Sequence, residues 1–356
     1  MNNQRRLTAA VAALAATATM SQAKADAVAD FYKGKQVAIQ VGFGAGGGMD
    51  TTARIWGRHL GKYIPGNPSV IVQNVPGGGS AKLASRLYNA TPNNGLTMGL
   101  ISSAVAIAPL WGKRKMKFDT LKFTWIGSLH RDIMACGVWN GAGQGIKTLH
   151  DLLKAKKPVI FGSSSPNSQL SMFPAFLKNV FGANVRVIHG YRGTKPISLA
   201  MQKGEVNGSC GMYESSVRGA FLQSYQSGQL NLFMQVGENK TVPFFGNATP
   251  IFSLLKTEEQ RKMGRLLFGH AELTRPIAAP PGVPKARRDA LRKALVDTMK
   301  DPGLIKDGKR INTTFTPISG EKMDQHWADY FKTPRDLVEK TWKAANVKRN
   351  PRKKKK

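Results

Sequence analysis

Two glycine-rich segments stand directly in front of predicted helices, in positions where backbone amides can meet a ligand. Residues 42–48 follow the strand-like residues 36–41, and residues 76–80 follow a second strand-like run at 69–75. Glycine lets a ligand approach the backbone closely because it has no side chain. The first turn of a helix adds unpaired N–H groups and the positive end of the helix dipole. Both segments therefore predict the binding of an anion.

Two hydroxyl-rich turns repeat this arrangement in the second half of the chain. Ser165 is predicted as an N-cap residue with Pro166 at the first helical position, and the helix that follows is predicted to cover residues 170–181. Thr194 is predicted to cap a helix that ends at Lys203. Each helix start stabilises an anion by about 0.3–1 kcal/mol. Any one loop alone is better interpreted as a tight turn, but loops after parallel strands converge on one crevice, so four together favour an anion site.

Motifs for nucleotide binding and catalysis are incomplete. Gly42, Gly44 and Gly47 match G-x-G-x-x-G, but the second strand ends in Gln73 and Asn74, where a dinucleotide site needs an acidic residue. The sequence contains no phosphate-binding G-x-x-x-x-G-K-[ST], no G-x-S-x-G and no H-E-x-x-H. Asp50 opens a helix and is interpreted first as a helix cap. We therefore predict a protein that is not an enzyme and that binds no cofactor.

Cysteine and histidine give no pattern of a metal site. The six histidines are scattered singly, without helical i, i+4 pairs. The two cysteines, Cys136 and Cys210, can pair in an oxidising compartment or can be small buried residues in separate strands. The second interpretation is preferred, and no metal site is predicted.

The N-terminal residues suggest export, and the net charge bears on the choice of partner. Arg5 and Arg6 precede an apolar run at 7–20 and small residues near Ala25, which predicts a signal peptide over residues 1–25. The formal net charge of +32 suits nucleic acid, an anionic membrane surface or anionic solutes. Because an exported protein does not meet nucleic acid, that partner is not expected. The basic residues 348–356 are predicted to form a solvated, disordered tail.

The elements that position these loops alternate strand, loop and helix, which predicts parallel α/β sheets. We divide the chain into one domain from residues 28–127 and 237–347 and another from residues 128–236. The crossovers are placed near Gly127 and Val236. A final helical region is predicted over residues 320–345.

The loop sequences resemble the binding proteins of tripartite tricarboxylate transporters, the TctC or Bug type. The family's first glycine loop is matched by Gly46, Gly47, Gly48, Asp50, Ala53 and Arg54. Its second loop is matched by Asn74, Pro76 and Gly77, and its Gly-Tyr-x-Gly loop by residues 190–193. The proline-rich residues 275–302 also match, and the matches together run from about Lys35 to Trp342. The chain departs from the family at Gly44 and Ala45, which replace a proline, at Asn207, which replaces an aspartate, and over residues 237–269.

This resemblance implies a type II periplasmic-binding-protein fold, with two α/β domains that close on a hinge like a Venus flytrap. It implies a periplasmic monomer that passes a small carboxylate to the permease subunits of a tripartite tricarboxylate-type transporter. The ligand would be held by amides and hydroxyls of opposing loops, at Phe43, Gly44, Ala45, Gly46, Gly47, Gly48, Asp50, Ser103, Ser163, Ser164, Ser165, Ser168, Tyr191, Arg192, Gly193 and Thr194. Two alternatives stay open: an α/β enzyme acting on an anionic substrate, and a sensing or adhesion protein that uses the same clasp.

Overall fold

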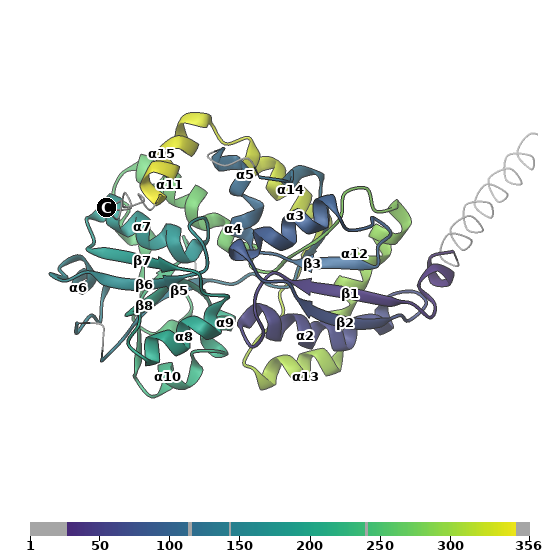
Figure 1. The fold of residues 1–356 in the computed structure, drawn as a ribbon, viewed down its shortest axis with the longest axis horizontal. Coiled ribbons are helices and arrows are strands. Elements are labelled where there is room, and N and C mark those ends of the chain that lie inside the picture. The colour runs from purple at the N-terminus through teal and green to yellow at the C-terminus, as the bar shows by residue number, and fades with distance from the viewer. Residues whose placement is uncertain (1–26, 113–115, 142–143, 239–240, 347–356) are drawn as a thin grey trace, which may run out of the picture.

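The computed structural model describes residues 27–112, 116–141, 144–238 and 241–346. The predicted signal peptide and the basic tail lie outside these residues. The described chain forms two lobes, each built on a six-stranded sheet with helices on both faces (Figure 1). This confirms the predicted periplasmic-binding-protein type of fold with two α/β units.

The first lobe contains the sheet with strand order β12-β4-β11-β3-β1-β2. Strands β2, β1 and β3 are parallel; the apolar residues that alternate along β1 and β3 are buried, whereas those of the edge strand β2 are partly buried. The strands are β1 (Gln36–Val41), β2 (Ser69–Asn74), β3 (Thr97–Leu100), β4 (Thr124–Ser128), β11 (Pro276–Ala279) and β12 (Ile318–Ser319). The helices are α2 (Gly48–Leu60), α3 (Ala81–Asn89), α4 (Ser103–Ala106), α5 (Ala108–Trp111), α12 (Lys285–Thr298), α13 (Pro302–Arg310) and α14 (Gly320–Phe331).

The second lobe repeats the arrangement with strand order β10-β9-β5-β8-β6-β7. In Figure 1, α7 lies on one face of this sheet and α8 and α10 lie on the other. The strands are β5 (Met134–Trp139), β6 (Val159–Ser163), β7 (Val185–His189), β8 (Gly208–Tyr213), β9 (Leu230–Val236) and β10 (Thr249–Pro250). The helices are α6 (Leu149–Leu153), α7 (Gln169–Phe181), α8 (Thr194–Gln202), α9 (Glu214–Arg218), α10 (Leu222–Gln226) and α11 (Glu258–Phe268).

The prediction of wholly parallel sheets is wrong, because one strand inside each sheet runs against its neighbours. These strands are β11 in the first lobe and β5 in the second. Both follow a crossover between the lobes. A strand that arrives from the other lobe enters its sheet at the end of the sheet nearest that lobe. Strands such as β1 and β3 run toward the other lobe and end there. The arriving strand must therefore run in the opposite direction.

Two crossovers connect the lobes. The first leaves β4 and enters β5 through residues 129–133, and the second enters β11 after α11 through residues 269–275. Strand β10 is hydrogen-bonded to β9, and Phe268 at the end of α11 packs on Phe173 of α7 with ring centroids 4.7 Å apart. We therefore propose that the second domain extends to about residue 268, beyond the boundary placed at Val236.

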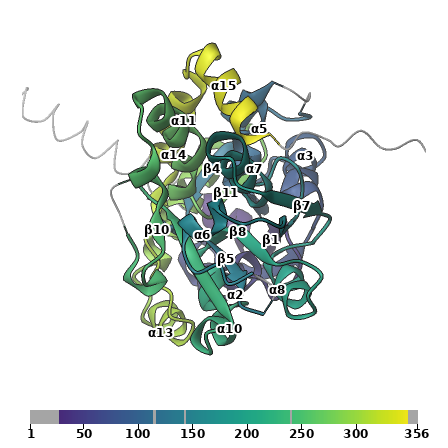
Figure 2. The same ribbon diagram turned by 90° about the vertical axis from the view of Figure 1, so that its left-hand side faces the viewer.

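The C-terminal region spans both lobes. The helix predicted over residues 320–345 is divided into α14 and α15 (Arg335–Ala345), with Pro334 as the residue before α15. Trp342 of α15 packs on Trp111 of the first lobe, and Asn179 of α7 donates a hydrogen bond to the Ala344 carbonyl. Figure 2 shows α11, α14 and α15 gathered at one end of the molecule. These contacts hold the lobes together at that end.

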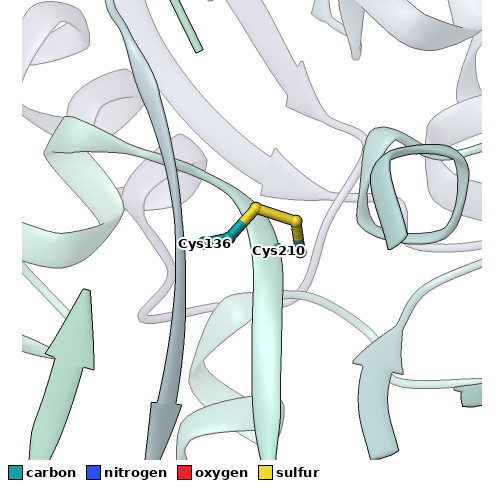
Figure 3. Close-up of a disulfide and its surroundings, with 2 residues drawn as sticks. All are labelled: Cys136 and Cys210. Atoms are coloured by element: carbon teal, nitrogen blue, oxygen red, sulfur yellow. A yellow bond between two sulfur atoms is a disulfide. The ribbon is translucent and has the colours of Figure 1, made fainter. Parts of the chain in front are cut away.

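The two cysteines form a disulfide, so the preferred interpretation of two unpaired residues is wrong. Cys136 of β5 and Cys210 of β8 are opposite each other in the antiparallel ladder (Figure 3). Both are fully buried. The sequence reading missed the pairing because it depends on β5 running antiparallel beside β8, which no local pattern reveals.

Removing this disulfide is expected to destabilise the second lobe. Replacement of both Cys136 and Cys210 by alanine should lower the free energy of unfolding by about 2–4 kcal/mol, because the bond closes a long loop in the unfolded chain; the two cysteines are 74 residues apart. Chemical denaturation of the parent and the double variant measures this. Added reductant should lower the stability of the parent alone. A parent protein that is equally stable with and without reductant would contradict a structural disulfide.

Within the described residues, no helix is long and apolar enough to cross a membrane.

Candidate functional site

A cavity of about 680 Å³ lies between the lobes. The arrowhead of β1 points toward the second lobe in Figure 1, so the loop after this strand faces it. Loops after β1, β2, β6 and β7 supply most of the wall, as expected for the carboxyl ends of parallel strands. The lining residues are Gly42, Phe43, Asn74, Val75, Pro76, Gly77, Gly78, Gly79, Lys82, Arg86, Ser164, Gly190, Tyr191 and Arg192.

The first glycine loop is shaped by a carboxylate that faces inward. Asp50, 3% exposed, accepts hydrogen bonds from the Gly46 amide at 2.9 Å, Asn74 Nδ2 at 2.8 Å and Arg54 Nε at 3.0 Å. Burial opposes its ionisation, but these hydrogen bonds outweigh burial and hold the pKa of Asp50 below its usual value. Gly46 has φ +78°, a conformation that favours glycine.

This geometry changes the role of Asp50. Gly47 is the N-cap residue of α2, so the interpretation of Asp50 as the cap is wrong. Both carboxylate oxygens of Asp50 are engaged by neighbouring donors, which leaves them poorly placed to meet a ligand. We therefore propose that Asp50 positions the loop and does not bind the solute.

The second glycine loop was quoted in the sequence motif but was not included among the predicted ligand residues. Gly77, Gly78 and Gly79 all have positive φ, at 149°, 57° and 65°. A Cβ on Gly79 would lie 2.7 Å from Ser165 Oγ of the second lobe. The loop thus needs glycine both for its backbone conformation and for the close approach of the lobes. Three consecutive glycines after a strand were the available signal.

The serine turn of the second lobe is organised by its own hydroxyls. Ser163 Oγ lies 3.0 Å from Ser168 Oγ and 2.6 Å from Ser171 Oγ. The helix α7 begins at Gln169 with Ser168 as its N-cap residue, so the prediction of Ser165 as cap and Pro166 as first residue is wrong. The local serine pattern was ambiguous, and the turn 165–168 decides the start of the helix.

Two hydroxyls of this turn remain open to a ligand. Ser164 Oγ and Ser165 Oγ are buried without a hydrogen-bond partner among the described residues. Such groups are costly unless a partner satisfies them. Ser164 lines the cavity, and Ser165 faces Gly79 across the lobes. Of the two, Ser164 is the hydroxyl that lines the cavity and is placed for an incoming acceptor.

The loop 190–194 meets the first glycine loop directly. The Gly44 amide donates a 2.8 Å hydrogen bond to the Arg192 carbonyl, and a Cβ on Gly47 would lie 3.3 Å from Thr194 Oγ1. Gly193 is the N-cap residue and Thr194 is the first residue of α8, so the predicted capping role of Thr194 is wrong. The two loops that the sequence paired thus lie side by side, one in each lobe.

Ser103 lies apart from the cavity lining. It is fully buried, with Oγ 3.0 Å from His270 Nδ1 and 3.4 Å from Tyr213 Oη. Burial lowers the pKa of His270 to about 3, so the imidazole is neutral. His270 Nε2 has no hydrogen-bond partner in the described part of the chain, whereas a serine–histidine catalytic pair needs an orienting acid. We therefore interpret the contact between Ser103 and His270 as packing between the lobes.

The charged residues that line the cavity are all cations. Lys82 and Arg86 of α3 and Arg192 of the second lobe line it, and no carboxylate is among the described lining residues. None of the three cations has an ion pair with another described residue. Of the predicted ligand residues, Phe43, Ser164, Tyr191 and Arg192 line the cavity. The sequence marked residues 76–80 as an anion-binding loop, and Asn74 and Gly190 as motif residues, without naming them as ligand residues; it gave no signal for Val75, Lys82 or Arg86.

A buried charged cluster joins the two crossovers behind the cavity. Arg275 of the second crossover is fully buried and contacts Met49 of the first lobe and Ser215 of the second. Ser215 Oγ donates in turn to Asp132 of the first crossover at 3.0 Å. Burial raises the pKa of Asp132 to about 6 and lowers the pKa of Arg275. Asp132 and Arg275, bridged by Ser215, thus tie the crossovers to both lobes.

With this geometry established, comparison with solved structures defines the class of fold. The periplasmic binding protein BugD has a TM-score of 0.71 at 18% identity, covering 88% of this chain and 99% of BugD. MatC from Rhodopseudomonas palustris with bound malate has a TM-score of 0.66 at 14% identity, covering 85% of this chain and 99% of MatC. The fold is thus that of the periplasmic binding proteins.

The resemblance to the Bug and TctC type is confirmed at the level of the fold. An R. palustris protein solved with adipate has a TM-score of 0.67 at 18% identity, covering 87% of this chain and 97% of its own. In sequence, the "UPF0065 protein in gbd 5'region" of Cupriavidus necator is 24% identical over 294 residues, 81% of this chain and 83% of that protein. No family model matches the chain.

Proposed function

We propose that this protein is a periplasmic solute-binding protein that captures a small carboxylate for a tripartite tricarboxylate-type transporter. The observation that carries the proposal is the interlobe cavity, which three cations line without any carboxylate among the described lining residues. The similar proteins solved with bound malate and with adipate support a carboxylate as the ligand. The predicted signal peptide and periplasmic location belong to the same proposal.

Both lobes are expected to hold the carboxylate, mainly through uncharged groups. The amides of Gly77, Gly78 and Gly79 approach from the first lobe, while Ser164 and residues 190–192 approach from the second. A helix N-terminus stabilises an anion by up to about 2 kcal/mol where it is partly buried. Binding between two lobes draws them together, as in other proteins that close on a hinge.

The binding role is favoured over catalysis for a chemical reason. An enzyme of the α/β class needs a nucleophile or a general base at the reacting atom. The described cavity lining offers cations, amides and hydroxyls, while the buried Ser103 and His270 lie away from it. We infer that the ligand leaves the protein chemically unchanged. The permease subunits and the monomeric state are part of the proposal.

Calorimetry with a panel of carboxylates tests the ligand class. We expect at least one organic acid to bind with micromolar affinity, about −8 kcal/mol. Neutral analogues of the same shape, such as the amide of each acid, should bind at least tenfold more weakly, because they lack the charge that the cavity attracts. Recovery of the intact acid after incubation distinguishes binding from turnover. Heat from neutral sugars or metal cations alone would contradict the proposal.

A further inference from the structure

Helix α3 brings two cations to the cavity at helical spacing. Lys82 and Arg86 are four residues apart, which places them on the same side of α3. The stem of Lys82 lies against the second glycine loop, since a Cβ on Gly77 would be 3.1 Å from Lys82 Cβ and 3.2 Å from its Cδ. Both residues line the cavity together with that loop. The loop and the helix therefore present amides and cations to the same space.

The cations are not balanced by the protein. Neither Lys82 nor Arg86 forms an ion pair with a described residue, and like charges at this helical spacing repel each other. Arg192 brings a third cation from the opposite lobe. Some cations of α2 and α12 meet carboxylates, as in the pairs Arg54–Asp50 and Arg292–Asp324. The positive charge at the cavity therefore comes from α3 and the facing loop, and no described lining residue neutralises it.

The cavity is larger than a single carboxylate bound at Ser164 would need. Ser164 lines one side of it, and Lys82 and Arg86 line the side formed by α3. A ligand whose first carboxylate meets Ser164 and the loop amides can extend through the volume of about 680 Å³ toward these cations. A second negative group would there meet Lys82 and Arg86.

We infer that Lys82 and Arg86 form a second anion subsite, which selects acids with two or more negative groups over acids with one. This inference rests on the proposed function, because it assumes that a carboxylate occupies the cavity. Both side chains are exposed, so the interaction is weakened by water and by salt. The two cations together are expected to change affinity by about tenfold, which is equivalent to 1.4 kcal/mol.

The test compares matched acids on the variant K82Q/R86Q. Calorimetry measures the Kd of succinate, glutarate and adipate, each beside the acid of equal length with one carboxylate: butyrate, valerate and hexanoate. In the parent protein we expect each dicarboxylate that binds to bind more tightly than its partner acid. In the variant this ratio should fall by about tenfold. Raised salt should reduce the ratio in the parent and have little effect in the variant.

A control variant, K154Q/K157Q, removes the same total charge from two exposed lysines that do not line the cavity. It should keep the ratio of the parent. If K82Q/R86Q also keeps that ratio, or if the control lowers it equally, the subsite is refuted while carboxylate binding stands. If the parent binds none of the six acids, nor any other acid of the wider panel, the proposed function fails and this inference fails with it.

Discussion

Gly47→Val is expected to weaken ligand binding by about 100-fold or more, equivalent to 2.7 kcal/mol, without unfolding the protein. Gly47 has φ −85° and ψ 166°, an extended conformation that valine adopts without strain. A Cβ there would lie 3.3 Å from Thr194 Oγ1 of the opposite lobe, and the two methyl groups of valine need further space. The lobes would then have to separate, which weakens the contacts that the second lobe makes with the ligand. Calorimetry and thermal denaturation measure the two effects.

Two further variants show whether this effect arises from the contact between the lobes. Thr194→Gly, added to Gly47→Val, removes the opposing side chain and should recover part of the lost affinity. Gly141→Val is the matched control, since Gly141 is exposed and a Cβ there would meet only the Trp139 ring, at 3.8 Å. It should bind like the parent. A Gly47→Val protein with unchanged affinity would show that the clasp is misplaced.

Arg275→Met should lower the free energy of unfolding by about 3–5 kcal/mol, because it leaves Asp132 buried without its opposite charge. Methionine keeps most of the volume of the side chain, so the loss reports on charge and hydrogen bonding. Arg275 also contacts Met49 and Ser215, which belong to different lobes. Chemical denaturation of the parent and variant at neutral pH measures the change.

A double-mutant cycle with Asp132→Asn isolates the charge pair. Once Asp132 is neutral, the same Arg275→Met change should destabilise less, since no buried carboxylate is left unpaired. Additive effects of the two substitutions would indicate that Arg275 acts through packing alone. A loss below about 1 kcal/mol for Arg275→Met would contradict the proposed tie between the crossovers.

The sequence by itself determined the local elements of this protein. The run QVAIQV and the helix after the first glycine loop appear as β1 and α2. Alternating or helically spaced apolar residues specify such segments locally. The glycine loops also mark where a ligand can approach the backbone. Glycine has no side chain, and it readily adopts the positive φ found at Gly46 and Gly79.

Tertiary structure decided what these elements meet. Cys136 faces Cys210 only because β5 enters its sheet antiparallel to β8. Asp50 turned inward because Asn74, 24 positions later, donates to it. The helix starts near Ser165 and Thr194 shifted by between one and three residues, since no side chain caps either helix and the serine hydroxyls bond one another and the Ser165 carbonyl instead.

The charged wall of the cavity was equally invisible in the sequence. Lys82 and Arg86 are ordinary exposed residues of a helix, with no motif to separate them from the other basic residues of the chain. They become candidates for the binding site only because α3 and the loop 76–79 close one side of a space that Arg192 of the second lobe closes from the other. The packing of the two lobes brings these three charges to one cavity, and no local sequence pattern encodes this arrangement.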